Sequence, residues 1–179
     1  AAVDATTGTV TGWNPNASGT VYAVAVSGGI VYLGGAFNLI NGTTTRNYAA
    51  AVDATTGTVT GWNPNASNIV HAVAVSGGAV YLGGEFITVN GTTRNRAAAV
   101  DAATGTVTGW DPNANSIVFA MALSGSTVYL GGFFAQVNLV TRNRAAAFDS
   151  NGRVTGWDPN ANNQVQAVAV SGGTVYLGG

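Results

Sequence analysis

Hydrophobic and polar residues alternate over short stretches of the chain, and glycine, proline, asparagine and threonine separate these stretches. The alternation is clearest in Val21–Val26 and in Thr9–Trp13, which are rich in β-branched residues. This pattern is typical of short β-strands that turn one face toward a core. We therefore expect an all-β protein.

The pattern recurs four times along the chain. The segment Gly8–Ala17 returns almost unchanged, and its tryptophan, Trp13, has counterparts 49, 48 and 47 residues apart (62 − 13, 110 − 62 and 157 − 110). A nearly constant period indicates that each unit buries its apolar face mainly against its neighbours. We expect one repeat array over residues 1–179 rather than several domains.

Each unit predicts four strands. In the first copy these are Ala1–Asp4, a short buried strand, Thr9–Trp13, Val21–Val26 and Ile30–Gly35. The most apolar of them, Val21–Val26, is expected to be the most buried. Glycine-rich turns join the strands in pairs, and a longer loop, Ala36–Asn47, leads to the next unit.

Four antiparallel strands in about 48 residues are the proportions of a β-propeller blade. Complete blades are expected at about 21–62, 70–110 and 118–157, with half a blade at 1–13 and another at 165–179. A half blade exposes unpaired N–H and C=O groups. Two completions are open: closure within the chain into a four-bladed ring, or exchange with another copy into an eight-bladed ring or a filament. A third interpretation is an excised piece of a longer array.

A recurring series of motifs resembles a known repeat. It reads Gly-Gly-Glu85-Phe86, Asn90-Gly-Thr-Thr-Arg-Asn-Arg96, Ala98-Ala-Val-Asp101, Gly105-Thr-Val-Thr-Gly-Trp110 and Val118-Phe-Ala-Met-Ala-Leu123. The series resembles a bacterial β-propeller repeat family, catalogued as a domain of unknown function, that occurs in tandem in large secreted or surface proteins. Departures are Asn138-Leu-Val-Thr141 and the last copy, which stops before its Arg-Asn-Arg. The resemblance covers essentially the whole chain and implies a propeller fold and an extracellular or cell-surface setting, but no catalytic residues.

The charge of the chain limits its partners. Charged residues make up only 7% of the sequence, with six arginines, no lysine and a net charge of −1. We therefore expect no nucleic-acid partner, and a small net charge permits copies to associate. No apolar run approaches the roughly 20 residues of a membrane span, so membrane insertion is not expected. Cysteine is absent, which excludes disulfides and thiol chemistry.

Three residue types recur at fixed places and are interpreted as structural. They are the tryptophans Trp13, Trp62, Trp110 and Trp157, the aspartates Asp4, Asp53, Asp101 and Asp149, and the arginines Arg46, Arg94 and Arg142. The tryptophans are expected to plug adjacent blades rather than to stack on a sugar. Each aspartate offers one carboxylate, which suits an Asx turn better than a calcium site. The arginines are expected to bond loop carbonyls or a neighbouring blade's aspartate.

His71 and Glu85 form the one pair that resembles an acid/base dyad. If Val70–Val75 folds back on Ala79–Gly84, the two side chains lie close together, and by the same pairing Tyr22 adjoins Ala36 and Phe119 adjoins Phe133. No other histidine exists, so no ring of metal ligands is expected. We interpret the pair as a rim hydrogen bond or ion pair and expect no enzyme activity, cofactor or metal.

Variable positions are the better candidates for binding. Four residues that differ between units share one equivalent place at the start of a strand, and these are Tyr22, His71, Phe119 and Gln166. Together with Glu85 they form a candidate binding rim, because repeat scaffolds usually recognise ligands through such positions. Drift at exposed sites is the competing interpretation. Four asparagines lie in glycosylation sequons or act simply as turn residues, and these are Asn16, Asn41, Asn65 and Asn90.

The sequence thus favours a non-enzymatic extracellular module that is structural or adhesive and associates with itself through the split blade. The alternative is a recognition domain that binds a glycan or protein at the loop face of the propeller.

Overall fold

A computed structural model of residues 1–179 shows an all-β fold built from three similar antiparallel sheets. Each sheet has three strands, with the second strand in the middle. The first sheet contains β1 (Thr20–Ser27), β2 (Ile30–Ala36) and β5 (Ala49–Asp53); the second contains β6 (Val70–Ser76), β7 (Ala79–Gly84) and β10 (Ala97–Asp101); the third contains β11 (Val118–Ser124), β12 (Thr127–Gly132) and β15 (Ala145–Phe148). A hairpin of β16 (Ala167–Ser171) and β17 (Thr174–Gly178) follows. The chain contains no helix that is long and apolar enough to cross a bilayer.

The strand predicted at Thr9–Trp13 is reduced to a single β-bridge in each later copy. In the first unit the bridge joins Val52 to Val59, and the equivalent bridges are Val100 to Val107 and Phe148 to Val154. Two backbone hydrogen bonds flank the first bridge, from Asp53 to Thr58 and from Thr60 to Ala51. The pairing stops there because the chain turns away at Trp62 and soon reaches Pro64, which has no N–H to donate.

The predicted long loop holds a small hairpin in every unit. These hairpins are β3 (Leu39–Ile40) with β4 (Thr44–Thr45), β8 (Thr88–Val89) with β9 (Thr92–Thr93), and β13 (Gln136–Val137) with β14 (Val140–Thr141). Asn90 and Gly91 form the two-residue turn of the second hairpin, with φ of 48° and 73°. Positive φ at both positions is the signature of a type I′ hairpin turn, for which Asn-Gly is preferred.

The prediction that Val21–Val26 and its copies are the most buried strands is wrong. Alternate residues of β1 are exposed, whereas Ala49–Val52 of β5 are fully buried. β1 is the less buried strand because it lies at the edge of its sheet, whereas β5 lies between β2 and the tryptophan-bearing segment. Ala49 and Ala51 contact the second sheet, while Ala50 and Val52 face the side of Trp13. Small side chains allow neighbouring sheets to approach closely.

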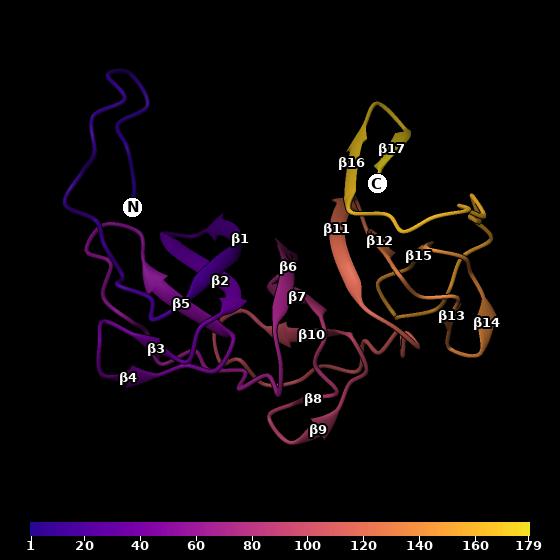
Figure 1. Ribbon diagram of the computed structural model, residues 1–179, viewed down its shortest axis with the longest axis horizontal. Helices are drawn as coiled ribbons and strands as arrows, with labels where there is room; N and C mark the ends of the chain where they lie inside the picture. Colours follow the sequence, from indigo (N-terminus) through magenta and orange to yellow (C-terminus); the bar gives the residue numbers. More distant parts are fainter.

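The three sheets and the β16–β17 hairpin follow one another around an open arc (Figure 1). β1 lies against β6, β6 against β11 and β11 against β16. The N-terminal segment, at the upper left of Figure 1, folds into a hairpin held by a bridge between Val3 and Val10. It makes no hydrogen bond to β16 or β17, at the upper right.

The closed four-bladed ring is therefore not formed within this chain. The N-terminal half unit and the β16–β17 hairpin lie at opposite ends of the arc, too far around it to pair. The prediction that Ala1–Asp4 is a buried strand is also wrong here, because no partner strand covers it. Val3 and Val10 are 58% and 73% exposed.

Candidate functional site

Tryptophan and tyrosine join successive sheets. The Trp62 ring packs edge-on against Tyr32 of the first sheet, with ring centroids 5.3 Å apart, and its Nε1 donates to the Asp101 carbonyl of the second sheet at 3.0 Å. Trp110 packs in the same way on Tyr81, at 5.2 Å. Trp62 and Trp110 are buried. Both tryptophans thus lie where a plug between units was predicted.

The first and last tryptophans each have half of this arrangement. Trp13 donates to the Asp53 carbonyl at 3.0 Å but has no tyrosine beside its ring. Trp157 packs on Tyr129 at 5.3 Å but finds no carbonyl for its Nε1. Both are only partly buried. Trp13 thus lacks the ring contact that Trp62 makes, and Trp157 lacks its carbonyl acceptor.

The recurring aspartates close Asx turns. Asp53 Oδ1 accepts hydrogen bonds from the Thr55 N–H at 2.9 Å, the Thr56 N–H at 2.7 Å and the Thr56 hydroxyl at 2.9 Å. Asp4 and Asp101 accept the same set from their own turns. The backbone N–H of the third turn residue, followed by its hydroxyl, lowers the pKa of Asp53.

No acidic cluster accompanies these turns. No three His, Asp or Glu side chains gather as metal ligands anywhere in the chain. Asp149 belongs to a shorter turn and accepts from the N–H groups of Asn151 and Arg153. All four aspartates thus accept hydrogen bonds from N–H groups of their own turns.

The predicted arginines bind loop carbonyls. Arg94 donates to the carbonyls of Thr93 and Thr108, both at 2.8 Å, and lies 3.6 Å from Asp111 Oδ2. Arg142 and Arg46 repeat the carbonyl bonds, and Arg142 has Asp158 at 3.6 Å. These side chains tie the small hairpin of each unit to its tryptophan-bearing segment.

A second set of loop residues was not predicted. Tyr48, Arg96 and Arg144 share one position and have positive φ of 61°, 64° and 66°. Arg96 donates to the Glu85 carbonyl, and the Arg144 guanidinium lies 4.7 Å from the centre of the Phe133 ring. The sequence gives no signal for this backbone conformation, because these residue types rarely adopt it.

The candidate rim residues form a row across three sheets. The rings of Tyr22 and His71 have centroids 5.2 Å apart, and those of His71 and Phe119 are 5.5 Å apart. Each of the three is the extra residue of a β-bulge, at the end of β1, β6 or β11 remote from its hairpin turn. Bulges commonly re-aim a side chain. Gln166 occupies the equivalent place before β16.

His71 and Glu85 are bonded, as the strand pairing predicts, with Nε2 and Oε1 2.9 Å apart. Ala36 and Phe133 have the same register as Glu85, opposite Thr20 and Ile117, and the Phe133 ring packs under the Arg144 guanidinium. The rim rings also contact one another between sheets, Tyr22 against His71 and His71 against Phe119.

The sequon asparagines are exposed turn residues. All four have positive φ between 44° and 53°, and they are Asn16, Asn41, Asn65 and Asn90. Asparagine tolerates this conformation better than most residues, which agrees with the turn role expected for them.

Comparisons with known proteins bear on the fold alone. No family model matches the chain, and no curated protein sequence matches it. The chain resembles the crystal structure of the computationally designed Ika4 protein, with a TM-score of 0.63 and 18% identity over 90% of this chain and 86% of that one. The computationally designed Ika8 protein matches with a TM-score of 0.61 and 19% sequence identity, over 88% of this chain and 42% of that one. A chain of the mitotic checkpoint complex matches with a TM-score of 0.59 and 18% sequence identity, over 84% of this chain and 43% of that one.

Proposed function

We propose that this protein is a non-enzymatic, extracellular β-propeller module, structural or adhesive, which associates with itself. In this proposal, Ala1–Asp4 of one copy pairs with β17 of another and completes a four-stranded blade. The observation that carries it is the match between two unpaired edges. β7 pairs with β10 so that Ala79, Val80 and Tyr81 oppose Asp101, Val100 and Ala99.

The same register can be transferred to the unpaired edges. It places Thr174 opposite Asp4, Val175 opposite Val3 and Tyr176 opposite Ala2. The N-terminal residues Ala-Ala-Val-Asp repeat those of β10. Because unpaired strand edges in water are a template for pairing, these two edges favour each other as partners.

The aromatic residues support the same pairing. Tyr176 is 58% exposed, whereas its counterpart Tyr32 is 4% exposed beneath Trp62. In the assembly Trp13 covers Tyr176, and the indole N–H of Trp157 meets the Asp4 carbonyl. All the partners missing at the two ends are then supplied by one contact.

Charge does not oppose this association, since the net charge is −1. Whether successive contacts close into a ring or run on as a filament depends on the rotation between copies. The repeat resemblance supports the proposed extracellular setting, and the resemblance and the sheet proportions support the proposed propeller type.

Sedimentation over a range of concentrations tests the proposal. We expect reversible association of the native chain. Val3→Asp places a carboxylate within the paired edge and should prevent it, because an unpaired buried charge is costly. Thr6→Asp, at the tip of the same hairpin, is the control and should associate normally. A chain that stays monomeric throughout would remove the assembly function.

A second candidate function is recognition at the rim, favoured by the continuous aromatic row of Tyr22, His71 and Phe119. Aromatic side chains with one polar end, such as tyrosine, are enriched at protein interfaces. A glycan array probed with the native chain and with Tyr22→Ala and Phe119→Ala variants tests this role. Binding that is the same in all three proteins would exclude the rim.

A further inference from the structure

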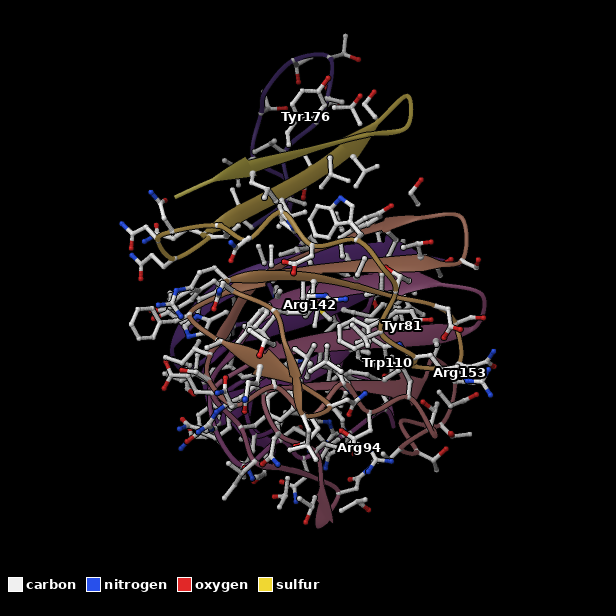
Figure 2. The ribbon with its side chains drawn as sticks, turned by 90° about the vertical axis from the view of Figure 1, so that its right-hand side faces the viewer. Tyr81, Arg94, Trp110, Arg142, Arg153 and Tyr176 are labelled. Carbon is white, nitrogen blue, oxygen red and sulfur yellow. The ribbon has the colours of Figure 1, made fainter.

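A cleft of about 630 Å³ lies between the second and third sheets, at the end of their strands remote from the His71–Phe119 row. Tyr81 and Trp110 form part of its wall, and Figure 2 shows them close together. Its other lining residues carry hydroxyl, amide or aliphatic side chains or are glycines, and include Ser76, Ala79, Thr108, Leu123, Ser126 and Asn151. None is charged.

The equivalent space between the first and second sheets holds a larger side chain. There Ile30 packs against the core, and the Tyr32 hydroxyl donates to the Ala102 carbonyl at 2.9 Å. At the cleft the position of Ile30 is taken by Ala79, which is three carbons smaller. The Tyr81 hydroxyl, counterpart of that of Tyr32, makes no hydrogen bond within the chain. One bulky side chain and one hydrogen bond are therefore missing at this interface.

The third sheet also meets Trp110 through a shorter turn. Asp149–Gly152 has one residue fewer than Asp101–Gly105, and Phe148 packs on the Trp110 ring at 5.8 Å where the second sheet has Val100. The Trp110 Nε1 is buried and has no acceptor, unlike that of Trp62. A buried donor without a partner is rare in proteins and calls for an explanation. The unpaired Trp110 N–H shows that hydrogen bonding at this interface, where the turn is shortened, is incomplete.

We propose that the cleft binds an uncharged saccharide, a monosaccharide or the end of a longer glycan. The hydroxyls of Tyr81, Ser126 and Ser150 and the amide of Asn151 can exchange hydrogen bonds with sugar hydroxyls. Leu123 and the aromatic pair supply apolar surface for the C–H face of a sugar ring.

The size and electrostatics of the cleft agree with this ligand class. Its volume lies within the range of about 300–1,000 Å³ typical of small-molecule sites. A charged ligand would find no counter-ion among the lining residues. The Trp110 N–H is covered by protein atoms, so the direct partners of the ligand are the other polar groups, and the indole acts as wall.

The proposal is independent of assembly through the terminal edges and of the rim. Calorimetric titration with glucose, galactose, mannose, N-acetylglucosamine and their β-1,4-linked dimers tests it. We expect at least one of them to bind the native chain saturably. Ala79→Ile, which restores the residue found in the first unit, should weaken that binding at least about tenfold by filling the cleft.

Tyr81→Phe removes one hydroxyl and should weaken binding by about five- to tenfold. Tyr32→Phe, at the interface between the first and second sheets, is the matched control and should leave binding unchanged. Circular dichroism and melting confirm that each variant is folded. No saturable binding of any sugar at up to about 50 mM overturns the proposal. Binding that survives Ala79→Ile but is lost in Tyr22→Ala overturns it as well, and assigns the sugar to the rim.

Discussion

Asp53 and Asp101 show how much of this fold is determined by single side chains acting on their own turns. Each carboxylate accepts two backbone N–H groups and a threonine hydroxyl within the next three residues. These bonds favour the ionised form and lower the pKa of both side chains below the usual 3.8. The turns that start the tryptophan-bearing segments thus depend on charge.

The consequence for stability has a definite sign. A folded-state pKa below that of the unfolded chain contributes stability that is complete above the unfolded value and is lost as pH falls through the folded value. Asp101→Ala should therefore lower the melting temperature at neutral pH. The difference in melting temperature between this variant and the native chain should become smaller as pH falls below 3.8.

Melting followed by circular dichroism between pH 7 and about pH 2 checks this prediction. Asp4→Ala is the matched control, since Asp4 has the same turn and a lowered pKa but lies on the exposed N-terminal hairpin. It should change the melting temperature little at any pH. A difference for Asp101→Ala that does not vary with pH would contradict the argument.

Leu139 has a left-handed backbone conformation, which is unfavourable for leucine. It occupies the second turn position of the β13–β14 hairpin with φ of 64°, where the second unit has Gly91, and it is 88% exposed. Leu139→Gly should raise the free energy of unfolding by up to about 1 kcal/mol, because a left-handed conformation costs a branched residue about 1–2 kcal/mol. Urea unfolding measures this change in the free energy of unfolding. The reverse change, Gly91→Leu, should be destabilising.

Residues whose role depends on their own turn could be predicted from the sequence, and the recurring aspartates are an example. Tyr48, Arg96 and Arg144 could not, because their positive φ is imposed by the loop around them. The cleft at Ala79 was missed for a related reason. A single smaller residue opens space only in relation to the sheet that faces it.

At the scale of elements, the Gly-Gly pair that ends each middle strand controls how closely sheets pack. A Cβ on Gly83 would lie 2.7 Å from Val118 Cγ1 of the next sheet. A Cβ on Gly84 would overlap the Ile69 carbonyl oxygen of the chain segment before β6. One glycine therefore admits the neighbouring sheet and the other admits the adjoining strand of its own sheet.

Gly83→Ala should destabilise the chain by about 1–3 kcal/mol through overpacking against Val118. Gly109→Ala is the matched control, because a Cβ there meets nothing within 4 Å. Its effect should stay within about 0.5 kcal/mol. Urea unfolding of both variants measures the difference, and equal effects would show that the glycine pair does not set the spacing between sheets.

The strands themselves were predicted with uneven success. The hairpins of β1 with β2, β6 with β7 and β11 with β12 follow from local alternation and glycine turns. The burial order was predicted wrongly, because hydrophobicity along β1 does not reveal that it is an edge strand. The alanine-rich β5 and its copies are the most buried, since their small side chains allow sheets to cover both faces.

For the whole molecule, the period of the repeat predicted an all-β array but not its closure. The decision between a closed ring and an open arc depends on the small rotation between neighbouring sheets, which no single unit encodes. In the proposed self-association, each end supplies the edge that the other lacks. Val3 and Tyr176 are exposed in the open arc, whereas their equivalents Val52 and Tyr32 in the first unit are buried.

Tyr176 gives the last prediction at this scale. Because its ring is 58% exposed and no aromatic ring packs on it, Tyr176→Ala should leave the melting temperature of the separate chain nearly unchanged. In the proposed assembly the ring is covered by Trp13, so its loss should weaken association by about 2 kcal/mol or more, which is more than tenfold in the dissociation constant. Tyr22→Ala, which alters a similarly exposed tyrosine at the rim, should leave association as it is. Sedimentation of the three proteins measures these constants, and equal values for the native chain and Tyr176→Ala would mean that copies do not meet along β17.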